Sequence, residues 1–558
     1  MMVKGLLLPC LLIYKTLVLV SAQDTNSSSS STTVNPHYAQ LLNYSMIFYE
    51  AQRSGKLPEN NRITWRQDSA LTDGFDNNVT LTEGYYDAGN YLKFTVPLSH
   101  AISLLSWGGI EWFDSYKRTN LVEDLRGTIK WGTDWLIKAH PEPNTLYVQV
   151  GGGEIDNAYW GPDTGIPLPR PSFMVNSSAP GTDAAALTSA ALSSASYLFK
   201  THFNDSVYAD ELLSHAISLM NFADTARPWK PYSQSVPAAV DYYNTNRYES
   251  QLLFGSLWLN KATGNRTYLD QANAYYDMFQ SELFYGITDW SDQTGAALVL
   301  GASLNAAKYK QAATDYLDRV LDTTSEDRIC NYTYGGLFYC QGYSYSNSVM
   351  PPLNTALLVG FMKKAFPETG TNYTDFIRNQ MNYILGENHM FTPYVVGVHK
   401  NSPQNPHHAA ASGGTDLKKI NESPRKMAHT LYGAIVGGPD YYDNFYDIRN
   451  DYRQTEVALD YNAPYQSLLA YQISIDASDP PYVNITQDRP NIISEDKSFA
   501  GWKIAVIVVA IILALTLIAS AFWWRKRKQR ANNSRKEKFI DNQKNDEAFV
   551  GGEQTVKV

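Results

Sequence analysis

Apolar residues recur along most of this chain at the spacing of an α-helix. Leu125, Ile129 and Leu136, for example, are separated by four and seven residues, which places them on one helix face. The segment 184–198 is instead rich in Ala and Leu throughout, as expected of a helix that is buried on more than one face. Patterns of these two kinds predict twelve helices, at 38–54, 96–107, 121–139, 183–201, 206–224, 248–263, 266–282, 294–308, 310–322, 352–366, 373–385 and 464–475.

Strand-like alternation is sparse and short, with 147–150 as one example. A chain of this kind could form an open helical solenoid, but a solenoid needs a sequence repeat of fixed period, and none is visible. We therefore predict an all-α domain in which the helices close into a toroid. Polar and aromatic residues concentrate in longer loops, where a rigid helical scaffold would carry a functional site. These loops are at 55–95, 140–182, 225–247 and 386–463.

The two ends of the chain have the patterns of a membrane-anchored secreted protein. Residues 1–22 begin with Lys4, continue with an apolar run and end in small residues, which predicts a signal peptide. Residues 503–524 are uncharged after the first position and mainly apolar, and at 1.5 Å per residue they are long enough to cross the roughly 30 Å core of a bilayer. The basic residues at 525–528 predict that 525–558 is a cytoplasmic tail. The sequence thus predicts a single-pass type I protein of the plasma membrane, with its large domain at the cell surface.

Two polar segments separate these ends from the central part of the chain. Residues 23–34 are rich in Ser and Thr and predict an unstructured leader. Residues 477–502 carry three prolines among polar residues and predict a stalk to the membrane. No stretch of similar composition interrupts 35–476, so we expect one large domain there.

Composition and charge narrow the class of protein further. Apolar residues make up 44% of the chain, which is too many for a disordered protein. The formal net charge is −9, and the large domain has no strongly basic segment that could neutralise phosphates. We therefore expect no nucleic-acid partner.

Cysteines and glycosylation signals agree with a secreted domain. Outside the predicted signal peptide the cysteines are Cys330 and Cys340, ten residues apart. A disulfide is favoured over a metal site, because two thiols without a nearby histidine supply too few ligands. Ten Asn-x-Ser/Thr triplets precede the predicted span and predict N-glycosylation on several faces. They are at Asn26, Asn43, Asn78, Asn176, Asn204, Asn265, Asn331, Asn372, Asn421 and Asn484.

Three stretches in the long loops are candidates for chemistry. The first, 84–94, holds Asp87 between small residues; the second is 406–408; the third, 445–463, is aromatic and acidic and contains Glu456. Each has a structural explanation when taken alone, because Asp87 could cap a helix, the histidines of 406–408 could be surface residues, and Glu456 could belong to a charged face.

Together, the three stretches resemble glycoside hydrolase family 9, the inverting endoglucanases, over about residues 38–475. The third stretch fits the C-terminal motif of that family at every defined position: an aromatic residue, then Asp447, Tyr452, Glu456, Ala458, Asn462 and Ala463. Supporting runs are at 51–58, 65–66, 149–151, 383–386 and 437–439. The resemblance implies an (α/α)6 barrel, in agreement with the twelve predicted helices, and a long open cleft in which Tyr and Trp stack on β-1,4-glucan.

The resemblance also implies roles for individual residues. Inverting hydrolysis needs a protonated carboxyl for the leaving oxygen and a carboxylate that activates water on the opposite face, roughly 6.5–9.5 Å away. Glu456 is implied as the general acid, with a pKa raised by a poorly solvated, acidic cleft. Asp87 is implied to hold the water, and Asp447 belongs to the same motif. The residues implied to bind glucan are His407, Tyr452, Trp160 and Tyr86.

The position of the catalytic base departs from the family pattern. The family loop reads Asp-Ala-Gly-Asp with the second Asp as base, whereas this chain has Asp87 first and Asn90 last. An amide cannot accept a proton at neutral pH. Three explanations stay open: Asp87 serves as a substitute base, the protein binds glucan without cleaving it, or slow hydrolysis persists through Glu456 and the cleft. Loss of a general base removes about 10²–10⁴-fold of rate.

Further departures affect the rest of the cleft. The sugar-gripping His-x-Arg of the family ends in Ala409 here, and its Asp-His ends in Asn157. An Asp-Glu pair that ligates calcium in many relatives is replaced by Ser250 and Gln251, so we predict no metal there and no cofactor. Glu83 replaces a glycine; it could intrude into the cleft, but a solvated loop residue is the favoured interpretation.

The leading hypothesis is a monomeric, membrane-anchored endo-β-1,4-glucanase whose activity is weakened by Asn90. The alternative is a catalytically inactive glucan-binding protein at the cell surface. A third possibility is action on another polysaccharide, because the sugar-gripping residues are altered.

Overall fold

The computed structural model describes residues 34–283, 286–305, 307–369, 371–492 and 498–550. The predicted signal peptide and all but the last residue of the predicted leader lie outside the described residues.

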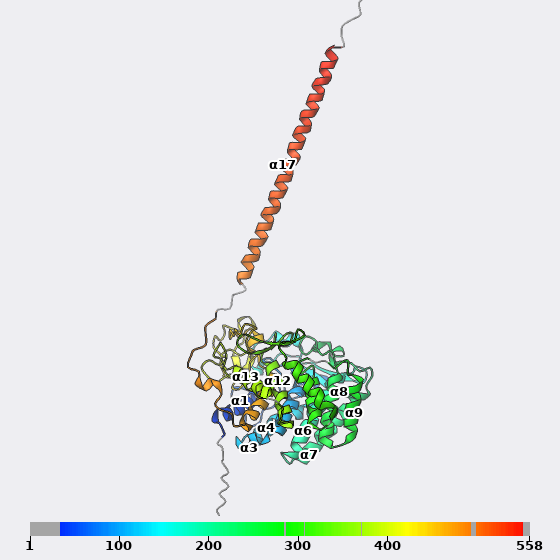
Figure 1. Ribbon diagram of the computed structural model, residues 1–558, viewed down its shortest axis with the longest axis vertical. Coiled ribbons are helices and arrows are strands. Elements are labelled where there is room, and N and C mark those ends of the chain that lie inside the picture. Colours follow the sequence, from blue (N-terminus) through cyan, green and yellow to red (C-terminus); the bar gives the residue numbers. More distant parts are fainter. Residues whose placement is uncertain (1–33, 284–285, 306, 370, 493–497, 551–558) are drawn as a thin grey trace, which may run out of the picture.

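Contacts between helices arrange twelve of them in a closed barrel of two concentric rings. Figure 1 shows several of these helices packed together in the globular part of the molecule. Neighbour contacts close the inner ring in the order α2 (Thr95–Glu111), α6 (Thr182–Thr201), α8 (Glu249–Thr263), α10 (Thr294–Ser303), α12 (Met350–Ala365), α16 (Leu459–Ser474) and back to α2. The outer partners are, in the same order, α4 (Val122–Ala139), α7 (Ser206–Thr225), α9 (Arg266–Met278), α11 (Ala307–Leu321), α13 (Thr371–Ile384) and α1 (Pro36–Ala51). The predicted (α/α)6 barrel is therefore confirmed, and each of the twelve predicted helices overlaps one of these.

The two rings follow from the two hydrophobic patterns in the sequence. Inner helices such as α10 are buried over almost their whole surface and consist largely of Ala, Leu, Gly and Ser. Small residues let the inner helices approach closely, since a Cβ added to Gly108 of α2 would lie 2.3 Å from the Ser467 hydroxyl of α16. Outer helices have one apolar stripe at helical spacing, as in α13, where it comprises Tyr373, Phe376, Ile377, Met381 and Ile384.

The loops that enter the inner helices meet at one rim of the barrel. The Leu459 N–H at the start of α16 donates to the carbonyl of Asp87, which precedes α2, at 3.0 Å. The Gln293 N–H before α10 donates to the hydroxyl of Ser250 in the first turn of α8, also at 3.0 Å. Helix N-termini carry partial positive charge, so this rim favours carboxylates. The barrel therefore gathers acidic residues where the chain enters its inner helices.

Short elements complete the domain. An antiparallel sheet contains β1 (Lys93–Phe94), β2 (Thr145–Val150) and β3 (Ser172–Asn176), and the predicted strand at 147–150 lies in β2. A hairpin of β4 (Cys330–Tyr332) and β5 (Phe338–Cys340) places Cys330 opposite Cys340, and the two form a disulfide. The remaining short α-helices are α3 (Phe113–Arg118), α5 (Gly153–Asn157), α14 (Ala409–Ser412) and α15 (Tyr452–Thr455).

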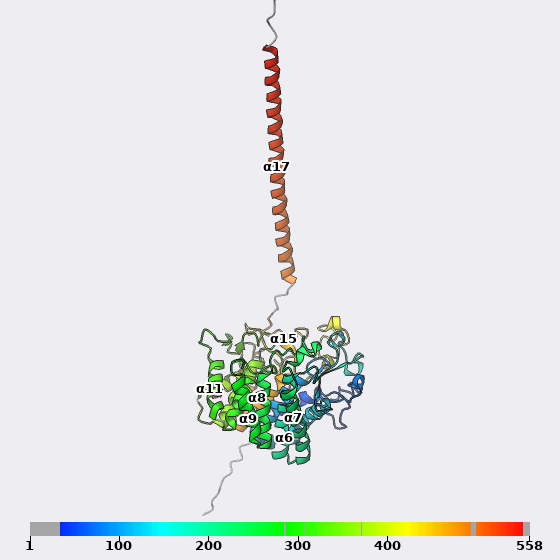
Figure 2. The same ribbon diagram turned by 90° about the vertical axis from the view of Figure 1, so that its right-hand side faces the viewer.

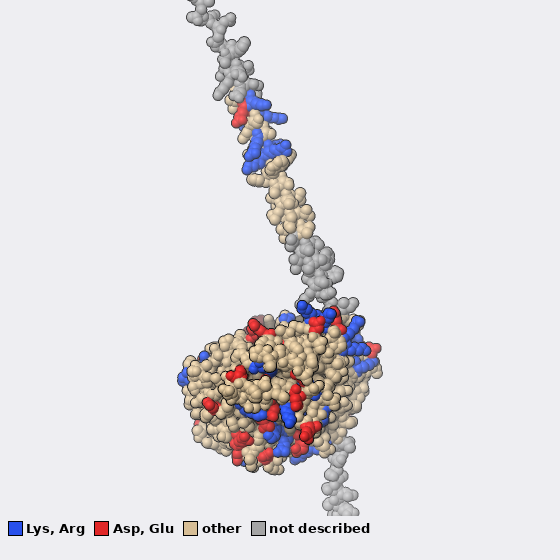
Figure 3. Space-filling view, turned by 180° about the vertical axis from the view of Figure 1, so that it is seen from behind, with Lys and Arg blue, Asp and Glu red and all other residues tan. Residues whose placement is uncertain are grey.

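The long C-terminal helix α17 (Ser498–Val550) stands apart from the barrel (Figures 1 and 2). Its segment Val509–Lys538 is long and apolar enough to cross a membrane and is not buried against the protein. In Figure 3 an uncharged stretch of this helix is followed by a band of Lys and Arg. This pattern agrees with the predicted single span.

The segment predicted as a stalk is in part a component of the barrel domain. Tyr482, within the 3-10 turn Pro481–Asn484, is only 5% exposed and belongs to the hydrophobic core. Ile485 packs over Gly386, where an added Cβ would lie 2.6 Å from the Ile485 side chain. The prediction of a stalk beginning at residue 477 is therefore wrong for its first residues. Proline-rich composition resembles that of a linker, but among the residues between the prolines Tyr482 is buried, and Val483 and Ile485 are partly buried against the core.

Candidate active site

The three candidate stretches of the sequence meet at the barrel rim. The Ala409 N–H donates to the Gly89 carbonyl at 2.8 Å, which joins the second stretch to the first. Gly89 is required there, because an added Cβ would lie 1.9 Å from the His407 carbonyl oxygen. The His407 N–H donates to the Thr455 carbonyl at 2.8 Å, and His407 forms a parallel bridge with Glu456. Backbone contacts thus bring Asp87, His407 and Glu456 to one place.

Asp87 has the environment of a proton acceptor. Its side chain is 3% exposed, and its Oδ2 accepts a hydrogen bond of 2.5 Å from the Tyr243 hydroxyl. Its Oδ1 has no hydrogen-bond partner among the described residues. Burial raises the pKa of Asp87 to about 7, with a further rise from the Glu456 carboxyl and an opposing effect of Tyr243. One carboxylate oxygen is therefore held in place, while the other is buried and keeps an unused hydrogen-bonding capacity among the described residues.

Glu456 has the environment of a proton donor. It is half-buried and lies between α15 and α16, immediately before the barrel helix. Burial raises its pKa to about 8, and the nearby Asp460 carboxylate raises it further. A carboxyl with this pKa is mostly protonated at neutral pH, as a general acid must be.

Asn90 is partly exposed at the turn that follows Gly89. Its side-chain oxygen accepts a long hydrogen bond of 3.4 Å from the Leu92 N–H. The amide can orient water through hydrogen bonds, but it cannot take a proton. In the loop 87–90 the proton-accepting capacity therefore resides in Asp87.

Sequence reasoning missed two residues that shape this acid pair. Tyr243, which bonds to Asp87, lies in a loop without a recognisable motif and 156 positions away in the sequence. Asp460 is 2% exposed, its Oδ1 has no partner in the described part of the chain, and burial together with Asp87 raises its pKa well above the ordinary range. Asp460 lies inside the third stretch. Its acidic side chain and its position one helical turn after Glu456 were the features of the sequence that could have identified it as part of the site.

The predicted sugar-binding residues divide into exposed and buried ones. Tyr452 is 51% exposed, and its ring centroid lies 6.5 Å from that of His407. The Nδ1–H of His407 donates to the Arg449 carbonyl at 2.7 Å, which leaves Nε2 as an acceptor. The Trp160 ring lies 4.8 Å from His407 but is only 5% exposed. His407 and Tyr452 are thus the members of the set that can contact a ligand directly.

Tyr86 differs from its prediction as a sugar-binding residue. It is 1% exposed, and its hydroxyl is 2.9 Å from the Ser69 hydroxyl. Together with Tyr91, Trp160 and Ala409 it forms a small apolar cluster beneath the rim. Tyr86 therefore supports the cleft from below, because the family motif specifies a residue type but not which ring faces solvent.

Ala409 is also buried, at 1% exposure, within that cluster. His408 is not a surface residue either: its Nε2 is 2.8 Å from the Gln52 side-chain oxygen, and its Nδ1 accepts from the Ala411 N–H. Burial lowers the pKa of His408 to about 3, so the ring is neutral. The alternative of two solvated histidines is wrong.

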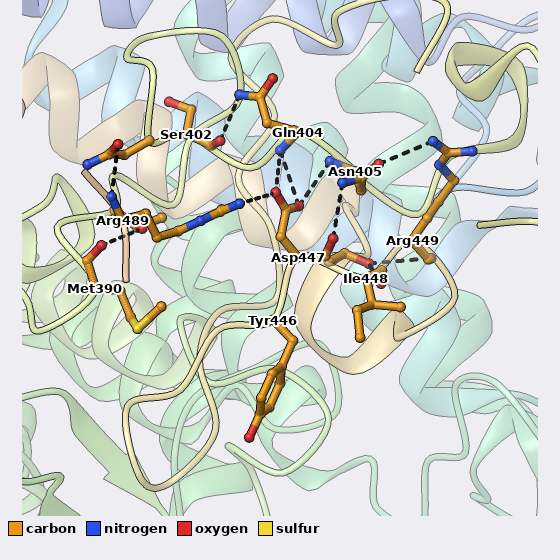
Figure 4. Close-up of polar contacts among 12 residues, drawn as sticks. Met390, Ser402, Gln404, Asn405, Tyr446, Asp447, Ile448, Arg449 and Arg489 are labelled. Atoms are coloured by element: carbon orange, nitrogen blue, oxygen red, sulfur yellow. Dashed lines mark hydrogen bonds and ion pairs between the residues drawn. The ribbon is translucent and has the colours of Figure 1, made fainter. Parts of the chain in front are cut away.

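Asp447 does not act on the substrate in this arrangement. Its carboxylate accepts hydrogen bonds from the backbone N–H groups of Gln404 and Asn405 and pairs with the guanidinium of Arg489 (Figure 4). Both carboxylate oxygens of Asp447 accept hydrogen bonds, and these bonds stabilise the loop before His407. Its place among the catalytic residues is thus corrected to a supporting one.

A groove with a volume of about 990 Å³ runs from α15 over the neighbouring loops. Its aromatic lining offers flat faces of the kind that stack on sugar rings. The lining includes Tyr339, Tyr345, Tyr441, Tyr442, Tyr446 and Tyr452. The lining extends along the chain to Arg453 and Gln454, two residues before Glu456.

The substituted positions elsewhere in the domain have local partners. Ser250 and Gln251 hydrogen-bond to each other and to backbone groups of 291 and 293, and neither supplies a carboxylate. Among the described residues no group of three or more His, Cys, Asp or Glu side chains is arranged to hold a metal. Glu83 pairs with Lys138 of α4, as a solvated loop residue can.

The comparisons with known proteins agree with this geometry. The family profile "Glycosyl hydrolase family 9" matches residues 38–469. Endoglucanase 13 of Arabidopsis thaliana is 35% identical over 478 residues, which cover 79% of this chain and 95% of that protein. Endoglucanase A of Bacillus pumilus is 37% identical, and the match covers 79% of this chain but 66% of that longer protein, just under two thirds.

Solved structures show the same fold. The endoglucanase of the termite Nasutitermes takasagoensis superposes with a TM-score of 0.73 at 36% identity, over 78% of this chain and 99% of that one. The cellulase Cel9M of C. cellulolyticum, solved with cellobiose, gives a TM-score of 0.71 at 30% identity, over 78% and 98% of the two chains. This chain therefore belongs to glycosyl hydrolase family 9, the family of these cellulase-type glycoside hydrolases.

Proposed function

We propose that the barrel domain hydrolyses internal β-1,4-glucosidic bonds of cellulose or a related glucan, with inversion at the anomeric carbon. The observation that carries the proposal is the pairing of Asp87 and Glu456, two carboxyls whose pKa values are raised by burial, together with an aromatic groove whose lining ends two residues before Glu456 in the chain. Membership of the endoglucanase family and the likeness to a cellulase solved with cellobiose support this class of substrate.

In the proposed reaction Glu456 gives its proton to the glycosidic oxygen as the bond to the anomeric carbon breaks. A water attacks that carbon from the opposite face, and the unpartnered Oδ1 of Asp87 takes the proton that the water loses. Tyr243 stabilises the ionised form of Asp87 through its hydrogen bond. The product carries the inverted configuration, and Asp87 then returns its proton to solvent while Glu456 is reprotonated.

The rate is expected to be low for a member of this family. Asn90 leaves proton abstraction to Asp87, which is only about half ionised at pH 7. Ala409 is buried in an apolar cluster and offers no group to a sugar hydroxyl. These two features also favour the second candidate function, a glucan-binding protein that has lost hydrolysis.

Release of reducing ends from a soluble β-1,4-glucan distinguishes a hydrolase from a glucan-binding protein. Purified full-length chain in detergent would be compared with Glu456→Gln and Asn90→Asp variants. Cleavage by the wild type that Glu456→Gln abolishes supports the enzyme. A silent wild type that binds glucan, beside an active Asn90→Asp variant, indicates the binding protein. Cleavage of a different β-glucan in the same assay would favour the third possibility, another polysaccharide.

We further propose that α17 anchors the domain as a single type I span at the cell surface, with a glycosylated, monomeric domain outside. The apolar stretch of α17 followed by basic residues supports this orientation. Protease digestion of sealed cells tests it: the barrel should be cleaved from outside while the C-terminal tail is protected.

A further inference from the structure

Beyond the end of the matched family region, the chain returns to the loop that carries His407. Residues 485–489, here called the strap, lie along the loop 399–408 that carries His407. The Asn401 side chain, which is buried, donates to the Gln487 carbonyl at 3.0 Å and accepts from the Arg489 N–H at 3.2 Å. The Asn401 side chain therefore holds the strap through its backbone groups, and these hydrogen bonds fix where the Arg489 side chain starts.

The Arg489 side chain connects the strap to Asp447. Its Nη2 lies 2.8 Å from Oδ2 of Asp447, whose carboxylate is 2% exposed (Figure 4). The guanidinium also lies over the Phe445 ring, 5.8 Å from its centroid. Asp447 has a positive φ of 53°, a conformation that a residue with a side chain rarely adopts without support. Arg489 thus supplies the counter-charge for a buried carboxylate at a conformationally demanding position.

From Asp447 a short chain of hydrogen bonds leads to His407. The Asp447 carboxylate accepts the N–H groups of Gln404 and Asn405 at 2.9–3.1 Å. The Asn405 side-chain oxygen accepts from Arg449 at 3.2 Å, and the Arg449 carbonyl accepts from His407 at 2.7 Å. Each step fixes the orientation of the next group, so the geometry of His407 depends on the anchoring of Asp447.

We propose that Arg489, twenty residues beyond the matched family region, is a positioning residue that holds the His407 loop in the glucan-binding arrangement. The functional unit then extends to at least residue 489, and the segment leading to the membrane span is mechanically joined to the cleft. The inference deepens the proposed function and rests on it for its effect on glucan, whereas its structural step can be tested without catalysis.

The test uses the full-length chain in detergent with Arg489→Ala and Arg489→Lys variants. Asp488→Asn is the matched control, since it removes the neighbouring ion pair with Lys400 on the surface and does not touch Asp447. Hydrogen exchange at the Gln404 and Asn405 amides reports on the loop directly. Cellotetraose affinity and, separately, KM and kcat report on the cleft.

We expect Arg489→Ala to raise amide exchange at 404 and 405. It should also weaken cellotetraose binding and raise KM. Each of these changes should be about tenfold, as for the loss of one charge-assisted hydrogen bond. Arg489→Lys restores part of each change, and Asp488→Asn resembles wild type. Exchange equal to that of the control overturns the proposal, as does faster exchange with unchanged affinity and KM. A wild type that binds cellotetraose without cleaving it refutes hydrolysis but leaves the exchange and affinity tests intact. A wild type that does not bind glucan refutes the proposed function and, through the missing effect on affinity, this inference as well.

Discussion

Replacing Asn90 by Asp tests the division of roles between Asp87 and Glu456. Asn90 is partly exposed at the rim, so an aspartate there would keep a pKa near its ordinary value of about 3.9. It would be fully ionised at neutral pH, unlike Asp87 with its pKa of about 7. A general base contributes about 10²–10⁴-fold, so we expect Asn90→Asp to raise kcat by up to that amount, or about 3–5 kcal/mol of barrier.

The pH dependence of the wild-type rate gives a second quantity that the Asn90→Asp variant should change. In the wild type, Asp87 must be ionised and Glu456 protonated, so the rate should peak between their pKa values of about 7 and 8. Between pH 7.5 and pH 5 the ionised fraction of Asp87 falls from roughly three quarters to roughly one hundredth, and the wild-type rate should fall on the order of fiftyfold. The Asn90→Asp variant should change less than about twofold over the same range, because its base stays ionised.

The assay is kcat for cellohexaose from pH 5 to pH 9, followed by reducing-end release. Asn157→Asp is a suitable control for the added charge, because it also replaces an exposed amide by a carboxylate. The Asn157 amide donates a hydrogen bond to the Tyr242 hydroxyl. If Asn90→Asp neither raises kcat nor extends activity to acidic pH, while folding and binding glucan as the wild type does, the assignment of the base position is refuted.

Three further predictions concern the supports of the site. Tyr243→Phe removes the hydrogen bond to Asp87, raises the Asp87 pKa further and should move the acidic limb of the rate profile to higher pH. Gly89→Ala should lower kcat/KM at least tenfold, and Gly127→Ala, at an unobstructed helix position, should not. Asp183 is buried and has a pKa of about 7, so it binds its proton more tightly in the folded than in the unfolded state. The free energy of unfolding should therefore fall by up to about 4 kcal/mol as pH rises from 4 to 7. Urea titrations of Asp183→Asn should show a flatter dependence on pH, and an unchanged slope would contradict this prediction.

The barrel was predictable because its two hydrophobic patterns are local. One apolar stripe marks an outer helix such as α13, and a nearly continuous run of small and apolar residues marks an inner helix such as α10. Their alternation along the chain, together with the family motif, specified the fold. The helix ends differed by a few residues, since caps and loop contacts decide them.

Contacts between distant segments were not predictable in the same way. Tyr243 reaches Asp87 from a loop without a motif, and Tyr86 is buried in a cluster that also contains Tyr91 and Trp160. Arg489 finds Asp447 through a segment whose composition resembles a linker. In each case the residue type is compatible with several environments, and only the packing of the barrel decides which one it meets.

Chemical rescue is the most direct test of Asp87 as the substitute base. An Asp87→Asn variant should lose about 10²–10⁴-fold of the rate of glucan cleavage, and sodium azide should restore cleavage, because the azide anion attacks without needing a base. The account predicts a glycosyl azide of inverted configuration, seen by NMR, from this variant. Cleavage by Asp87→Asn at the wild-type rate, with no azide product, would contradict it.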